Sequence, residues 1–94
     1  MRLRVQYTAQ LRAAVGRREE EVDLPEGSTL AELLVHIATE LCRETAGYLL
    51  APGGGLQPSL LVAVNNRAIS THEARAMPIN SGDVVMLLPP IAGG

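Results

Sequence analysis

The side chains able to bind a metal or act as a nucleophile are few and far apart in this sequence. His36, His72 and Cys42 are the only imidazoles and the only thiol among its 94 residues. Metal centres and nucleophilic sites need several such groups together, whereas His36 and Cys42 are six residues apart on a predicted helix and fall on different faces. Cys42 is interpreted as a small residue near a helix end, and His72 beside Glu73 as a solvated polar pair. We therefore predict no metal site, and a single cysteine excludes an intramolecular disulfide.

Two further motifs resemble ligand sites but lack parts that those sites need. Gly53-Gly54-Gly55 is not followed by Lys-Ser/Thr and does not open a helix after a strand, so a flexible loop is favoured over a phosphate-binding loop. The acidic run Glu19-Glu20-Glu21 lies on a predicted strand whose neighbour carries Arg2 and Arg4. This arrangement indicates cross-strand ion pairs or a solvated face rather than metal ligands. We expect the chain to bind no cofactor of its own.

The end of the sequence is the remaining candidate for chemistry. Pro89-Pro90 is followed by Ile91-Ala92-Gly93-Gly94, which we interpret as a flexible tail after a domain formed by residues 1–88. Prolines hold a chain extended, and glycines let a backbone and its carboxylate enter a narrow active site of another protein. Because a carboxylate is a poor electrophile, it enters acyl chemistry only after activation by a partner that holds ATP. The alternative is a frayed tail without a role.

The tail needs a sheet to carry it, and alternating apolar residues predict one. Leu3, Val5 and Tyr7 fall on one face of the first predicted strand. The run from Leu60 to Val64 is apolar throughout and is bounded by Asn65-Asn66, so we expect a central strand over residues 60–65 that is buried on both faces. Pro89 and Pro90 must end the last strand, since proline cannot donate a ladder hydrogen bond. The predicted strands are residues 2–7, 18–24, 60–65, 67–70 and 84–88, with the first two paired antiparallel.

One long helix is predicted to cover the sheet. Thr29 and Glu32 form a capping box, and an apolar stripe at helical spacing follows it to about Arg43. A short helical turn over residues 10–15 is closed by Gly16. Residues 46–59 are rich in Gly and Pro and are predicted to be a loop. The stripe consists of Leu30, Leu33, Leu34, Ile37 and Leu41.

Composition fits one small α+β domain with a mixed sheet and one main helix packed across it. Apolar residues make up 47% of the chain and the net charge is −2, which excludes an electrostatic surface for nucleic acid or an anionic membrane. All eight basic residues are Arg, so no lysine is present for building isopeptide chains. No signal peptide or membrane span is recognised, and we expect a cytoplasmic protein.

Four stretches together resemble a known family. They are the segments 7–16 (YTAQLRAAVG), 62–65 (VAVN), 81–85 (SGDVV) and the ending 88–94 (LPPIAGG). The chain is similar along its whole length to the MoaD/ThiS sulfur carriers, and the two prolines before Gly-Gly are most like the small subunit of molybdopterin synthase. The resemblance implies a ubiquitin-like β-grasp fold.

The resemblance also implies a role for each tail residue. Gly94 would be adenylated by an E1-like adenylyltransferase and converted to a thiocarboxylate with sulfur from a sulfur donor. The tail would then enter the large subunit of molybdopterin synthase, forming a hetero-oligomer in which its sulfur attacks the pterin precursor. Gly93 would permit threading, while Pro89, Pro90, Ile91 and Ala92 position the reacting group. The expected partner surface on the domain comprises Thr8, Arg12, Leu87 and Leu88.

Three alternatives remain open at the level of sequence. A carrier of the same class would serve cysteine, thiamin or tRNA thiolation, and the enlarged glycine-rich loop resembles relatives with such acceptors. A ubiquitin-like modifier would attach Gly94 to lysines of other proteins. A β-grasp interaction module would have a tail with no covalent role.

Overall fold

A five-stranded mixed sheet forms the base of the molecule. The computed structural model describes residues 1–41 and 43–88. The strand order is β2-β1-β5-β3-β4, with β1 and β5 parallel and the other neighbours antiparallel, as the predicted mixed sheet requires. β5 therefore lies in the centre of the sheet between the first strand and β3. The strands are β1 (Arg2–Tyr7), β2 (Glu19–Asp23), β3 (Leu61–Val64), β4 (Arg67–Ile69) and β5 (Val84–Leu88).

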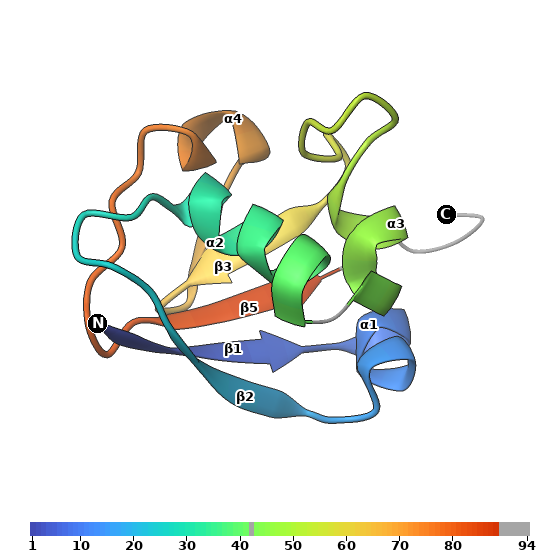
Figure 1. Cartoon of the computed structure of the whole chain (residues 1–94), viewed down its shortest axis with the longest axis horizontal. Helices are drawn as coiled ribbons and strands as arrows, with labels where there is room; N and C mark the ends of the chain where they lie inside the picture. The colour runs from blue at the N-terminus through green and yellow to red at the C-terminus, as the bar shows by residue number, and fades with distance from the viewer. Residues whose placement is uncertain (42, 89–94) are drawn as a thin grey trace.

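Helices pack on one face of this sheet and at one of its ends. Figure 1 shows α2 crossing in front of the sheet, with α1 beyond the end of β1. None of the helices in residues 1–41 and 43–88 has the length and apolarity that crossing a bilayer requires. The helical elements are α1 (Ala9–Val15), α2 (Leu30–His36), the π-helical turn η1 (Ile37–Leu41), the 3-10 turn η2 (Arg43–Thr45), α3 (Ala46–Leu49) and α4 (Thr71–Ala74).

The main helix begins as predicted but changes its winding half-way. Thr29 and Glu32 form the expected capping box, yet after His36 the chain continues as a π-helix. The Thr39 hydroxyl donates to the Val35 carbonyl at 2.8 Å and so competes for the acceptor that an α-helical amide would use. The wider winding shifts the apolar stripe, so Ala38 is buried and Leu41 is 43% exposed. The prediction that Leu41 belongs to the buried stripe is wrong.

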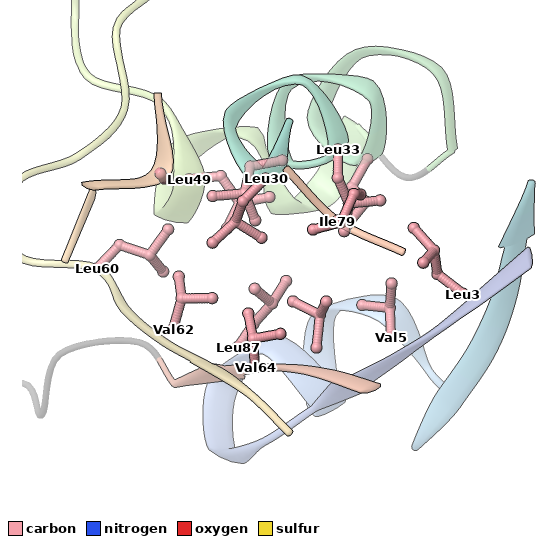
Figure 2. Packing of buried hydrophobic residues seen from close by; sticks show 14 of the residues in the cluster. Leu3, Val5, Leu30, Leu33, Leu49, Leu60, Val62, Val64, Ile79 and Leu87 are labelled. Carbon is pink, nitrogen blue, oxygen red and sulfur yellow. The ribbon is translucent and has the colours of Figure 1, made fainter. Parts of the chain in front are cut away.

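The core lies between the helices and the sheet and is almost entirely aliphatic. Figure 2 shows Leu30 and Leu33 of the helix facing Val62, Val64 and Leu87 of the sheet. These side chains are buried, and together they hold the helix across the strands.

Three short segments differ from the sequence-based expectation. Residues 46–59 are not loop throughout, because α3 occupies the first four of them and buries Leu49 completely. His72 lies in α4 rather than in a loop, where Ser70 and Glu73 form a second capping box. β3 is not buried on both faces, since Leu61 is 59% exposed while its neighbour Val62 is buried. Because every residue of this run is apolar, the sequence does not indicate which side chains face the core and which face solvent.

Turn residues set the hairpins of the sheet. Asn65 and Asn66 both have positive φ, 50° and 68°, and connect β3 to β4 through a two-residue turn. Asparagine tolerates this backbone region better than most residues do. The predicted boundary at Asn65-Asn66 is therefore confirmed, and it fixes the register of Val64 against Arg67.

Candidate functional site

Hydrogen bonds among polar residues fix the start of the central strand β5. The Asn65 side chain donates to Asp83 at 3.0 Å and accepts from the Val84 amide at 2.9 Å. Asp83 also accepts from the Asn80 amide at 2.8 Å. The turn before β5 is thereby joined to the end of β3, which sets the position at which the last strand begins.

The other end of β5 is held by Thr8. β1 pairs with β5 up to Tyr7 and Leu87, and there the first strand ends. The Thr8 hydroxyl then donates to the Leu87 carbonyl at 2.9 Å. Thr8, predicted to lie on the partner surface, is thus half-buried and bonded to the strand that leads to the tail.

Two other residues of the predicted partner surface lie in different environments. Leu87 is fully buried and points into the core (Figure 2), so its assignment to the partner surface is wrong. The reason is strand alternation, because Val85 and Leu87 point inward while Met86 and Leu88 point to the opposite face. Arg12 is exposed on α1.

An apolar patch covers half of the sheet face turned away from α2, which we call the open face. By register, Gln6, Met86, Ala63 and Ala68 lie side by side across four strands, and Leu61 lies opposite Leu88. A shallow groove of about 540 Å³ adjoins these residues and is bounded by Pro58 and Thr71. Exposed apolar patches of this kind are typical of protein-binding surfaces. The apolar patch consists of Leu61, Ala63, Ala68, Met86 and Leu88.

The other half of the open face is charged. Arg4 pairs with Glu19 at 3.6 Å, and Arg2 pairs with Glu21 at 3.8 Å and with Asp23 at 3.2 Å. The hydrogen bond from Arg2 to Asp23 and the charges of Asp23 and Glu21 raise the pKa of the Arg2 guanidinium. The predicted cross-strand ion pairing is confirmed, and it gives the open face one apolar half and one polar half.

The predicted chemical residues lie mostly outside this description. Gly94, Gly93, Ala92, Ile91, Pro90 and Pro89 all fall beyond Leu88, and Cys42 lies in the gap at residue 42. Within residues 1–41 and 43–88, no three His, Cys, Asp or Glu side chains gather to hold a metal. The described residues supply the open face of the sheet and the strand that precedes residues 89–94.

Comparison with known proteins decides the family. A family model described as the ThiS family matches residues 5–94 of this chain. This chain belongs to the ThiS family. Small archaeal modifier protein 3 of Haloferax volcanii is 28% identical over 94 residues, which cover all of both chains.

Solved structures extend the comparison to the fold. The crystal structure of SAMP1 from Haloferax volcanii matches with a TM-score of 0.87 and 21% identity, covering all of both chains. A putative molybdopterin converting factor, subunit 1, from Pyrococcus furiosus matches with a TM-score of 0.75 and 28% identity, covering 97% of this chain and 99% of that one. The ThiS-family chain therefore has the ubiquitin-like β-grasp fold that the sequence resemblance implied.

Sequence analysis missed Leu61, Ala63 and Met86 as surface residues. The usable signal was the alternation of side chains along a strand, counted back from the Asn65-Asn66 turn. This alternation places Ala63 and Leu61 on the opposite face from Val62 and Val64. Using this signal requires knowing which face of the sheet the helix covers. The apolar run does not indicate that face.

Proposed function

We propose that this protein is a sulfur carrier whose reacting group is the carboxylate of Gly94. The observation that carries the proposal is continuity: β5 runs through the centre of the sheet and leads into residues 89–94, and the family match includes those residues. On this proposal partners bind the surface of the described domain, while Gly93 and Gly94 enter the partners' active sites. Pro89, Pro90, Ile91 and Ala92 set the reach of the tail.

The chemistry requires an activating partner. A carboxylate oxygen of Gly94 attacks the α-phosphorus of ATP held by an E1-like adenylyltransferase, forming the acyl-adenylate and releasing pyrophosphate. Hydrosulfide, or its equivalent from a sulfur donor, then attacks the acyl carbon and displaces AMP, which leaves a thiocarboxylate. ATP is thus a substrate used by the partner, and the carrier needs no cofactor of its own.

Molybdopterin biosynthesis is the acceptor pathway that we propose. The Pyrococcus furiosus protein named as subunit 1 of a molybdopterin converting factor is similar over nearly the whole chain. A subunit 1 works with at least one further subunit, so the large subunit of molybdopterin synthase is the expected receiving partner. The apolar patch on the open face gives such a partner an apolar centre to bind. Carriers for cysteine, thiamin or tRNA thiolation share the same activation chemistry and differ in the acceptor.

A second candidate function is protein modification. It is favoured by the similarity to Small archaeal modifier protein 3 over the full length of both chains. A modifier would use the same acyl-adenylate but transfer Gly94 to an amine of another protein. The two functions therefore share the activation step and separate at the acceptor.

Intact-mass spectrometry of protein isolated from its native host tests the proposal. A carrier shows a mass increase equal to replacement of one oxygen by sulfur at Gly94, whereas a modifier appears in larger conjugates joined through Gly94. A variant with one residue added after Gly94 moves the terminal carboxylate by up to about 3.3–3.6 Å, beyond the tolerance of reacting atoms. We expect it to fold normally but not to be adenylated. Normal adenylation and thiolation of the extended protein, without trimming, would refute the role of Gly94.

A further inference from the structure

The start of α1 differs from the starts of α2 and α4. Thr29 at α2 and Ser70 at α4 both accept a hydrogen bond from a backbone amide of their own helix, at 3.2 and 3.1 Å. Thr8 occupies the same capping position at α1, yet its side chain makes no such bond. Its hydroxyl instead donates to the Leu87 carbonyl, 79 residues further along the chain. A residue type that usually caps its own helix is therefore used to hold the end of β5.

The residue after Thr8 is strained in a way that supports this use. Ala9 has φ of 48°, a backbone region that residues with a Cβ seldom adopt. Thr8 itself stays extended, with φ −126° and ψ 160°, so it continues the direction of β1 by one residue. The sharp turn at Ala9 then starts α1 without pulling Thr8 away from β5. Strain of this kind persists where the surrounding structure requires a particular geometry.

The bond lies at the point where β5 loses its neighbour on one side. β1 pairs with β5 as far as Tyr7 and Leu87, whereas β3 continues to pair with it at Leu88 through Leu61. The Thr8 hydroxyl therefore gives β5 one further hydrogen bond on the β1 side. With that bond the strand is held from both sides up to its last residues. Without it, only β3 would hold the strand end beyond the last β1 pair.

We propose that Thr8 is a positioning residue that fixes the direction in which the chain leaves the sheet at Leu88. This inference rests on the proposed sulfur-carrier function, because the direction of the strand end decides where a tail can reach. A misplacement of about 1 Å at a reacting group can lower the rate by about 100-fold even when binding is intact. Thr8 thus acts on the reaction rate through Leu87 and Leu88 rather than through contact with the partner.

Three variants separate this role from a general effect on folding. Thr8→Val removes the hydroxyl and keeps the branched shape, while Thr8→Ser keeps the hydroxyl. Ser28→Ala is the matched control, because Ser28 also donates its hydroxyl to a backbone carbonyl, that of Pro25 at 2.7 Å, but in the turn before α2. Each variant is assayed with the cognate adenylyltransferase by pyrophosphate exchange, and the order parameter of the Leu88 amide is measured by NMR.

We expect Thr8→Val to lower kcat by about 10- to 100-fold with KM for the carrier unchanged. Its Leu88 order parameter should fall from about 0.85 toward about 0.6, while Thr8→Ser and Ser28→Ala stay near the parent. A raised KM with normal kcat, or an unchanged Leu88 order parameter in Thr8→Val, would overturn the positioning role. If the parent protein itself is not adenylated, the proposed carrier function fails, and the order parameters alone then decide whether Thr8 holds the strand end.

Discussion

Replacing Leu61 by alanine should weaken partner binding while the domain stays folded. Leu61 is 59% exposed in the apolar patch, so more than half of its side chain is available to be buried by a partner. Full burial of a leucine side chain is worth about 1.5–3 kcal/mol, and the exposed share therefore corresponds to about 1–2 kcal/mol. That free energy equals an increase in Kd of about 5- to 30-fold.

The assay compares binding and stability in the same variants. Kd for the adenylyltransferase is measured by calorimetry with Leu61→Ala and with the control Leu41→Ala. Leu41 is a matched control because it is also leucine, is 43% exposed and lies on η1, which follows α2 (Figure 1), rather than on the open face. We expect only Leu61→Ala to raise Kd, and the buried shares of the two side chains limit the loss in unfolding free energy to about 1–2 kcal/mol in either variant.

Two results would refute the reasoning. If Leu41→Ala weakens binding and Leu61→Ala does not, the partner binds the helical side and the open face has another role. If Leu61→Ala lowers the unfolding free energy by several kcal/mol, its side chain contributes to the core and the register of β3 is wrong.

Three further predictions concern the fold and the thiol. Leu33→Ala should lower the free energy of unfolding in urea by about 2–5 kcal/mol, while the exposed Val35→Ala stays close to the parent; equal midpoints would contradict the packing of α2. Ala9→Gly should raise thermal stability by about 1 kcal/mol because it relieves the positive φ; a lower melting temperature would refute strain there. Cys42→Ser should leave thiocarboxylate formation at Gly94 intact, and loss of transfer by a folded variant would move the chemistry to the thiol.

Local signals predicted the sheet and the main helix well. The strand from Arg2 to Tyr7 follows from the alternation of apolar residues, and the start of the helix follows from the capping box at Thr29. Both signals depend only on neighbours in sequence. The π-helical turn after His36 did not follow, because it depends on a competition between a threonine hydroxyl and a backbone amide for one carbonyl. The buried Leu49 was missed because the glycines and prolines around it dominate the composition of the segment.

The chemistry of the tail stays a prediction, and the surface of the candidate site was predicted only in part. The tail and the need for an activating partner follow from residue types at the end of the sequence. The patch residues Leu61 and Met86 depend on which sheet face the helix covers, and Leu87 was assigned to the wrong face for the same reason. The bond between Thr8 and Leu87 joins positions 79 apart, so no local pattern signals it.

The alternation of β5 gives one strand three separate tasks. Val85 and Leu87 point into the core, Met86 and Leu88 point to the open face, and the backbone leads into the tail. Because the core-facing and open-face side chains alternate, we expect substitutions at Met86 to change partner binding with little effect on folding, and substitutions at Leu87 to destabilise the fold. Loss of activity in a Leu87 variant therefore carries no information about a partner. Substitutions at the open-face positions and at Thr8 are therefore the ones that test the proposed binding and positioning roles while leaving the core side chains in place.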